Sequence, residues 1–346
     1  MEQQLRQEDA AVALAPAPSA STAIVGYGGF TDAHPGFMLS WETVVVASEI
    51  LAALGTSLYL LYKKAKHDRS ASSSSSSSSP RAIIPHNDPS QGTPITHLRS
   101  CCSLDALLYF RLVALAFYVV VQLYDLYRTR FLCMIFYTSW NFIAQGVYFA
   151  IAASRTFQAR KLQRGARRGY APLLDESKAS GGGVPAVTAS RTAHRGWIRL
   201  ELALDVCLAT SILISVVVWT ILYPYAVKAH IPEKILNWVS YCQHAINLVF
   251  LQIDFLSTHH VVSFHALPLL IAWPSVYSVF TWLLHGTVAK GFWPYPFMEV
   301  NTPYAPLWYA GLLFAHVIGF ALVYAISRWK VSSSHGELTM ELSEAS

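Results

Sequence analysis

The sequence has few charges and lacks the composition of a soluble domain. Only 13% of its 346 residues are charged, 53% are hydrophobic, and the mean hydropathy is +0.36. The formal net charge of +5 does not indicate nucleic-acid binding, because the basic residues gather in short loops beside apolar runs. We therefore expect a polytopic membrane protein whose partner is the lipid bilayer and not a nucleic acid.

The sequence also has little that indicates disulfides, metals or a known catalytic motif. Of its five cysteines, two are adjacent and three lie inside apolar runs, which excludes a disulfide framework. We find no CxxC, HExxH or GxSxG spacing, and we expect no metal and no cofactor. Next to an apolar run, Cys101 and Cys102 are either ordinary thiols or sites of S-palmitoylation. His259, His260 and His265 have no carboxylate or thiolate beside them, so we expect solvated or interface histidines.

Seven apolar runs are long enough to cross the roughly 30 Å of a bilayer core. We therefore predict an all-α transmembrane bundle of about seven spans. Pro224 predicts the end of the fourth run, because proline cannot continue a helix without losing a hydrogen bond. The runs occupy residues 44–62, 104–126, 131–153, 200–222, 237–256, 266–288 and 306–327.

The distribution of Lys and Arg predicts the orientation of these spans. Loops 63–103 and 154–199 hold six and ten of these residues. The positive-inside rule places both loops and the C-terminus in the cytosol, and the N-terminus outside or in the lumen. The endoplasmic reticulum and the plasma membrane both fit, and the oligomeric state is not predicted. The expected regions are a flexible segment 1–43, an extra first helix 44–62, a disordered Ser-rich loop 63–103, a membrane-embedded bundle 104–327 with its basic loop 154–199, and a cytosolic tail 328–346.

The third run carries a polar stripe. Thr138, Asn141, Gln145 and Tyr148 recur at spacings of three and four residues, so they share one face of a helix. Lipid offers no hydrogen bonds. Such a face should therefore turn toward the protein interior or a wet cavity and meet polar groups of another span there.

The fifth run provides the matching face, with His244, Asn247, Leu251 and Asp254. In the predicted topology Thr138 and His244 both lie roughly 10 Å below the non-cytosolic surface, at about 1.5 Å of rise per residue. A hydroxyl level with an imidazole can serve as nucleophile and general base for acyl transfer.

Several polar side chains are candidates to support such a pair. The amides Asn141, Gln145 and Asn247, or His285 near the end of the sixth run, can orient the base or stabilise an oxyanion. The alternative is that these polar residues, Thr138 and His244 among them, make neutral hydrogen bonds between helices.

Arg111, Asp205 and Asp254 are charged residues inside the apolar runs and need partners there. We expect Arg111 to form a buried, structural ion pair with Asp205 or Asp254, because an isolated charge is costly in hydrocarbon. The alternative for this set is a proton relay toward His316 in the seventh run.

Several segments resemble the androgen-induced hydrolase family, also called rolling-stone-like proteins, and in particular its plant-type branch. They are FYTSWNFIAQGVYFAI, WTILYP, NWVSYCQHAINLVF and FTWLLHGTVAKGFWPYPFMEVNTPYAPLWYAGLLFAH, within residues 104–327. The resemblance implies a metal-independent membrane hydrolase of fatty-acid esters of hydroxy fatty acids. It assigns the family's threonine to Thr138 and its histidine to His244. Ala245 and Tyr241 stand where the animal members have threonine and histidine.

The favoured hypothesis is therefore a membrane hydrolase of long-chain lipid esters that uses Thr138 and His244. The first alternative is a non-enzymatic transporter or channel with a path along His244, His285, His316 and Arg111. A seven-span receptor is disfavoured by the absence of DRY-like and NPxxY-like elements. An interaction protein that uses the Ser-rich and basic loops is the remaining alternative.

Overall fold

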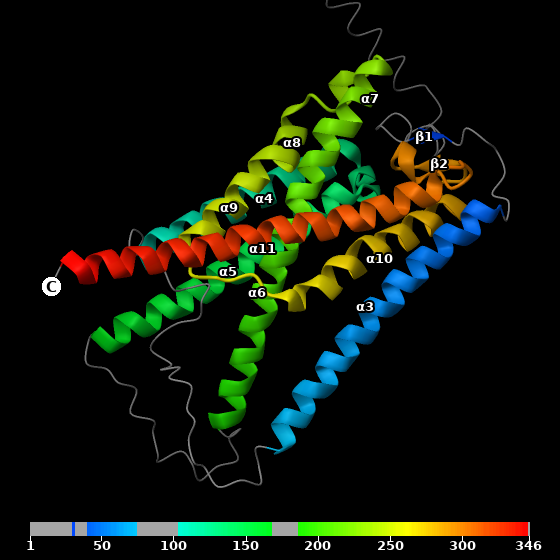
Figure 1. The fold of residues 1–346 in the computed structure, drawn as a ribbon. Coiled ribbons are helices and arrows are strands. Elements are labelled where there is room, and N and C mark those ends of the chain that lie inside the picture. Colours follow the sequence, from blue (N-terminus) through cyan, green and yellow to red (C-terminus); the bar gives the residue numbers. More distant parts are fainter. Residues whose placement is uncertain (1–29, 32–39, 75–102, 168–185, 345–346) are drawn as a thin grey trace, which may run out of the picture.

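The computed structural model of the chain describes residues 30–31, 40–74, 103–167 and 186–344. In this part the protein is all-α apart from one two-stranded sheet, and its helices form seven rods (Figure 1). The first three rods and the last two are α3 (Trp41–Ser74), α4 (Leu104–Thr129), α5 (Tyr137–Arg167), α10 (Leu267–Gly286) and α11 (Ala305–Glu344).

The two remaining rods each contain a π-helical segment. The fourth rod joins α6 (Ala186–Val217), η3 (Val218–Leu222) and α7 (Tyr223–Lys228), and the fifth joins α8 (Trp238–Tyr241), η5 (Cys242–Ile246) and α9 (Asn247–Ser257). Short 3-10 turns complete the connections: η1 (Leu132–Ile135), η4 (Pro232–Lys234), η6 (Phe264–Ala266) and η7 (Pro296–Met298).

Five of the rods have the length and the apolar composition of membrane spans. They cover Trp41–His67, Leu104–Thr129, Leu200–Lys228, Phe264–Gly286 and Ala305–Ser332. Large apolar side chains such as Leu51, Val120 and Phe314 are exposed on their outer faces, as expected for surfaces that contact lipid. The chain is therefore an integral, multi-pass membrane protein. The other two rods, α5 and α8 to α9, are the ones that carry the polar faces.

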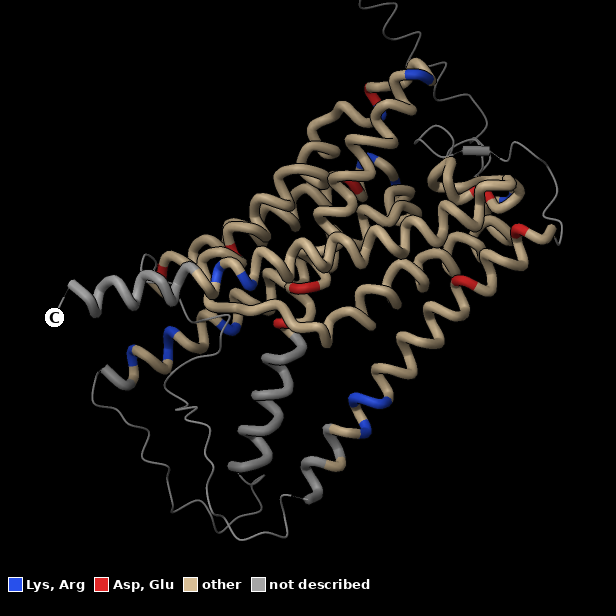
Figure 2. Tube along the Cα trace, viewed as in Figure 1, with Lys and Arg blue, Asp and Glu red and all other residues tan. Residues whose placement is uncertain are grey.

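Successive rods run in opposite directions, so each end of the bundle contains the starts of some helices and the ends of others. The C-terminal ends of α3, α5 and α11 and the starts of α4 and α6 point to the same side of the bundle, spread apart from one another, and we call this side the basic end (Figure 1). Lys63, Lys64, Arg160 and Lys161 lie there, as Figure 2 shows by the blue ends of α3 and α5. The opposite end, which carries the small sheet, is called the sheet end.

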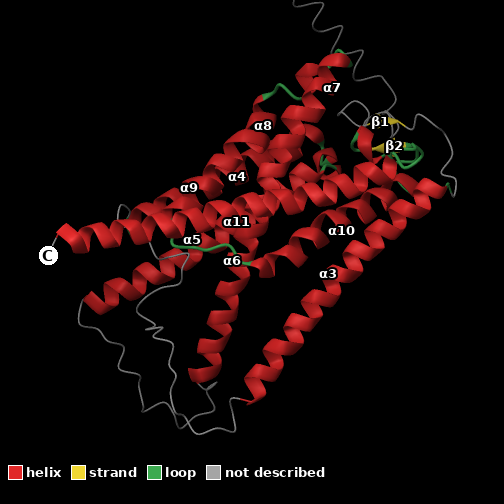
Figure 3. Cartoon of the chain, in the orientation of Figure 1, coloured by secondary structure: helices red, strands yellow, loops and turns green. Residues whose placement is uncertain are grey.

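Four helices extend beyond the boundaries expected from the apolar runs (Figure 3), and one of them, α6, begins at Ala186 inside the expected loop 154–199. Helix α3 continues through Ser74 into the expected loop 63–103, and α5 through Arg167 into the expected loop 154–199. Helix α11 continues through Glu344 over the expected tail 328–346. The length of an apolar run reflects the thickness of the hydrocarbon core of the membrane. The helix itself is longer, because helical hydrogen bonding continues into the polar sequence beyond the run. Cys101 and Cys102 lie outside the described residues.

The N-terminal segment expected to be flexible contains an ordered strand. Strand β1 (Phe30–Thr31) pairs antiparallel with β2 (Phe292–Trp293), with Phe30 opposite Trp293. Helix α3 then begins at Trp41, where the Ser40 hydroxyl oxygen accepts a hydrogen bond from the Thr43 N–H at 3.2 Å. Residues 30–31 of the segment 1–43 therefore pair with the loop between α10 and α11.

Pro224 does not end the fourth rod, contrary to expectation. The helix widens into η3 just before the proline, and the Tyr223 N–H bonds to the Val218 carbonyl, five residues back. Widening a helix by one residue relieves the clash between a proline ring and the preceding turn. Pro224 then lies in the first turn of α7, where its missing N–H costs little.

The third apolar run becomes helical later than expected. Arg130 and Phe131 adopt positive φ angles of 48° and 68°, and the chain then makes the 3-10 turn η1 before α5 begins at Tyr137. As a result Thr138 lies in the first turn of α5 and not inside a span that starts at residue 131.

Candidate functional site

Two cavities lie side by side at the sheet end of the bundle. One has a volume of about 90 Å³ and a mainly apolar lining, and we call it the apolar cavity. The other, of about 170 Å³, has many polar groups in its lining and is called the polar cavity. Four residues line both cavities and so form their shared wall: Thr138, Val218, Leu222 and Tyr295.

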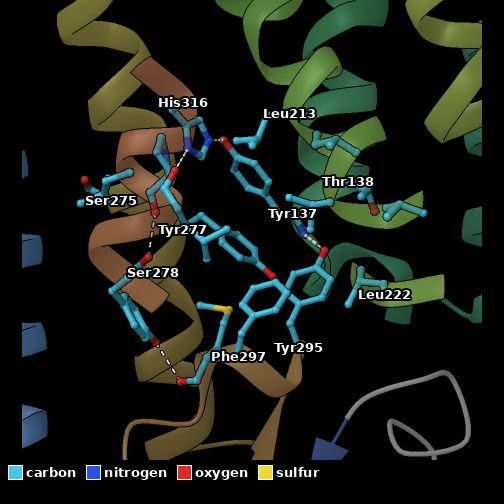
Figure 4. Close-up of a pocket in the computed structure, with 18 of the residues that line it drawn as sticks. Tyr137, Thr138, Leu213, Leu222, Ser275, Tyr277, Ser278, Tyr295, Phe297 and His316 are labelled. Carbon is cyan, nitrogen blue, oxygen red and sulfur yellow. Dashed lines mark hydrogen bonds between the residues drawn. The ribbon is translucent and has the colours of Figure 1, made fainter. Parts of the chain in front are cut away.

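The polar side chains around the apolar cavity are engaged with protein partners (Figure 4). The His316 Nδ1 lies 2.7 Å from the Leu312 carbonyl, which only accepts, so this nitrogen carries the proton. The other ring nitrogen, Nε2, therefore accepts from the Tyr137 hydroxyl at 3.0 Å. The Tyr277 hydroxyl donates to the Ile135 carbonyl at 2.7 Å. The remaining lining is largely hydrocarbon and suits an acyl chain.

The polar cavity is lined by a carboxylate, two cations and an imidazole. Asp125 Oδ1 accepts from the Arg128 guanidinium at 3.0 Å, and its Oδ2 accepts from the Gln243 amide at 3.1 Å. Lys234 is exposed at the same cavity. His244 is only 9% exposed, and its Nδ1 has no hydrogen-bond partner among the described residues. A buried nitrogen without a partner is uncommon and is a candidate for binding or proton transfer.

His244 is held in place by contacts on two sides of its helix. It lies in the π-helical segment η5, and its carbonyl oxygen accepts from the Ser215 hydroxyl at 2.7 Å and the Trp219 indole at 3.3 Å. Its neighbour Gln243 is held by Asp125 on the other side. Single π turns inside α-helices are frequent at functional sites.

Thr138 occupies the first turn of α5, at the junction of the two cavities. The Tyr295 hydroxyl accepts a hydrogen bond from the Tyr137 N–H at 3.1 Å and also contacts the backbone and side chain of Thr138 (Figure 4). Burial raises the pKa of Tyr295 to about 12, although these hydrogen bonds offset part of the effect.

The two residues expected to carry catalysis thus line the same cavity. No hydrogen bond joins their side chains in the described part of the chain, and their catalytic roles stay a prediction. The faces expected to be buried are buried: Asn141, Gln145 and Tyr148 on α5, and His244, Asn247, Leu251 and Asp254 on the fifth rod.

The residues expected to orient the base or stabilise an oxyanion have other partners, and none of them lines either cavity. Asn141 donates to the Tyr137 carbonyl at 2.8 Å and accepts from the Trp273 indole at 3.1 Å. Gln145 accepts from the Asn247 amide at 3.2 Å. The His285 Nδ1 lies 3.0 Å from the Phe292 carbonyl. Asn141, Gln145 and Asn247 thus make the interhelical hydrogen bonds that were the alternative, whereas His285 contacts strand β2, just after its own helix.

The intramembrane charges form pairs toward the basic end. Arg111 binds Asp254 through two contacts of 2.7 and 3.1 Å, and both side chains are fully buried. Asp254 also accepts from the Tyr148 hydroxyl at 2.5 Å, and Arg111 donates to Thr156 at 2.6 Å. The predicted pairing of Arg111 is confirmed with Asp254.

Asp205, the other proposed partner of Arg111, binds elsewhere. Its carboxylate lies 2.6 Å from His260 Nε2 and accepts from the Ser263 N–H at 3.0 Å. His260 is 1% exposed, so the expectation of a solvated or interface histidine is wrong for this residue, whereas His259 and His265 are exposed. The loop between α9 and α10 folds inward and brings His260 to Asp205. Helical periodicity cannot predict this contact, because His260 lies in a loop.

Sequence reasoning missed two residues of the site. Asp125 lies in the last turn of the second apolar run, and a carboxylate at that depth was a signal for a cavity. Tyr295 belongs to the aromatic WPYPF segment, whose composition equally suits the headgroup region. No periodic pattern distinguishes one tyrosine of that loop from another.

Comparison of the chain with known protein families, with curated proteins and with solved structures gives no match. The chemistry of the site therefore has to be argued from its own geometry.

Proposed function

We propose that the protein is a membrane-embedded hydrolase of long-chain lipid esters. One observation carries the proposal. Thr138 lies where an apolar cavity meets a polar cavity, and His244, whose buried Nδ1 has no hydrogen-bond partner among the described residues, also lines the polar cavity. An ester with a long acyl chain has the same division, with hydrocarbon on one side of its carbonyl carbon and the leaving alcohol on the other.

In this proposal the acyl chain occupies the apolar cavity and the ester carbonyl lies at Thr138. The Thr138 hydroxyl oxygen attacks the carbonyl carbon while His244 accepts the hydroxyl proton through Nδ1. The tetrahedral intermediate then expels the alcohol, which takes the proton back from His244. A water molecule, activated by the same nitrogen, hydrolyses the acyl-threonine and releases the fatty acid.

The resemblance to the androgen-induced hydrolase family supports the same two residues through an independent argument. It rests on sequence segments, whereas the cavity argument rests on where the side chains lie. Within that family the substrate class would be fatty-acid esters of hydroxy fatty acids, and we propose that class here.

Purified protein assayed with long-chain 4-methylumbelliferyl esters tests the mechanism. We expect Thr138→Ala and His244→Ala each to lower kcat by at least about 10³-fold, since nucleophile and base act as a unit. Thr281→Ala is the matched control, because Thr281 is a buried threonine that bonds within α10 and lines neither cavity. Full turnover in both site variants, or equal loss in the control, would reject the proposal.

We also propose that all seven rods cross the membrane, with the basic end in the cytosol. The alternating directions of the rods and the basic ends of α3 and α5 support this orientation. A tag on the C-terminus should be digested by protease added to the cytosolic side of sealed vesicles, and a tag on the N-terminus should be protected. The reverse pattern would refute the orientation.

A further inference from the structure

Acyl transfer by Thr138 needs a hydrogen-bond donor for the negative oxygen of the tetrahedral intermediate, which is often a large part of the catalytic effect. Asn141, Gln145 and Asn247 line neither cavity, although the Gln145 Nε2 is a buried donor without a partner among the described residues. The donor must therefore be another group at the shared wall, next to Thr138.

Tyr295 has the required position. Its side chain lines both cavities, and its hydroxyl interacts with Thr138. Figure 4 shows the bond that this hydroxyl makes with Tyr137 at the start of α5. The oxygen of this hydroxyl accepts the Tyr137 N–H at 3.1 Å. Because an N–H can only donate, this bond leaves the phenolic proton of Tyr295 for an acceptor on another side.

The neighbouring acceptor for that proton is the neutral oxygen of the Tyr277 hydroxyl. Tyr277 is a neighbour of Tyr295 but gives its own proton to the Ile135 carbonyl, so its oxygen can only accept from Tyr295. The Thr138 hydroxyl does not compete for this proton, because its own hydrogen bond is donated to the Tyr295 oxygen and lowers the pKa of Tyr295. A hydrogen bond to an anionic oxygen is roughly twice as strong as one to a neutral oxygen. An oxyanion formed at Thr138 would therefore compete successfully for the proton.

We infer that Tyr295 is the catalytic residue that donates its O–H to the oxyanion formed when Thr138 attacks the ester. This inference rests on the proposed function. The proton stays on Tyr295 throughout, while the carbonyl oxygen gains negative charge as the Thr138 bond forms and loses it as the alcohol leaves. Burial, which raises the pKa of Tyr295, keeps the phenol protonated at physiological pH.

Tyr295→Phe tests the inference, because it removes the hydroxyl and keeps the ring. We expect kcat on the 4-methylumbelliferyl ester to fall about 10²- to 10³-fold with little change in KM, as for loss of an oxyanion donor. Affinity for an alkyl trifluoromethyl ketone, which forms a tetrahedral oxyanion with the nucleophile, should fall by a similar factor. Binding of the free long-chain fatty acid, which has no tetrahedral centre, should be unchanged.

Tyr118→Phe is the matched control. Tyr118 is another fully buried tyrosine, whose hydroxyl contacts Gln145 and the Asn247 carbonyl, and it lines neither cavity. It should lose a hydrogen bond but keep kcat. The inference is overturned if Tyr295→Phe keeps kcat within about threefold, or weakens fatty-acid and ketone binding equally, while Thr138→Ala is inactive. If Thr138→Ala itself keeps full activity, the proposed function fails instead.

Discussion

The two halves of the bundle bury different kinds of polar group. Toward the basic end the buried charges have close partners: Arg111 with Asp254, Asp205 with His260, and Lys330, whose ammonium donates to the carbonyls of Phe255, Thr258 and His260 at 2.6 to 3.0 Å. Toward the sheet end the buried polar groups are mostly neutral, and His244 Nδ1 has no partner among the described residues. Asp125 is the charged exception, and it is paired with Arg128 at the polar cavity.

This difference indicates that the charged half contributes mainly to stability and the cavity half mainly to the proposed reaction. A charge inside the membrane is tolerated only with partners, and a residue locked in that way cannot exchange a proton without losing them. The His244 imidazole lines a cavity, and its Nδ1 has no partner among the described residues, so it has no such constraint. We therefore expect substitutions in the charged half to lower the free energy of unfolding and those in the cavity half to lower turnover.

The largest effect on stability is expected for Arg111→Ala. The change leaves Asp254 buried without its cation, so we expect a loss of about 3 to 5 kcal/mol in the free energy of unfolding. Unfolding in detergent, followed by tryptophan fluorescence, measures it. The double variant Arg111→Met and Asp254→Leu removes both charges and should recover part of the loss. If the losses measured for the single variants Arg111→Met and Asp254→Leu simply add in the double variant, the two residues are not coupled.

A smaller loss is expected for Lys330→Met, which keeps most of the apolar stem. Three backbone carbonyls at the end of α9 lose their donor, and we expect a cost of about 1 to 3 kcal/mol. Arg328→Met is the control, because Arg328 is a nearby but exposed cation and should change stability by less than about 0.5 kcal/mol. Equal losses in the two variants would contradict a specific role for Lys330.

The smallest effect is expected in the neutral network of the cavity half. Replacing Gln145 by Met and Asn247 by Leu together removes both bonded amides, and the Tyr118 hydroxyl keeps the Asn247 carbonyl as an acceptor. The free energy of unfolding should change by less than about 1 kcal/mol. Turnover of the same variant sharpens the comparison. A fall of 100-fold at unchanged stability would return these amides to the orienting role suggested by the sequence.

Much of the architecture was predictable because the residues on the buried face of a helix recur every three or four positions in the sequence. Apolar runs identified the rods, and spacings of three and four residues identified the buried faces of α5 and the fifth rod. Counting residues from the predicted membrane surface placed Thr138 and His244 at one level. The count for Thr138 assumed a span from residue 131, whereas α5 begins at Tyr137, but both residues line the polar cavity. The pairing of Arg111 followed from the cost of an isolated charge, with two candidate partners left open.

The tertiary structure decided which groups meet. Asp254 and not Asp205 reaches Arg111, because the loop after α9 brings His260 to Asp205. Asn141 and Gln145 share a helical face with Thr138, yet they bond to neighbouring helices, while Tyr295 reaches Thr138 from a loop more than 150 residues away. The sequence by itself determined which faces of α5 and of the fifth rod are buried, since that depends on helical periodicity and the bilayer. Partners and cavities depend on loop paths and side-chain packing between rods, which no local pattern encodes.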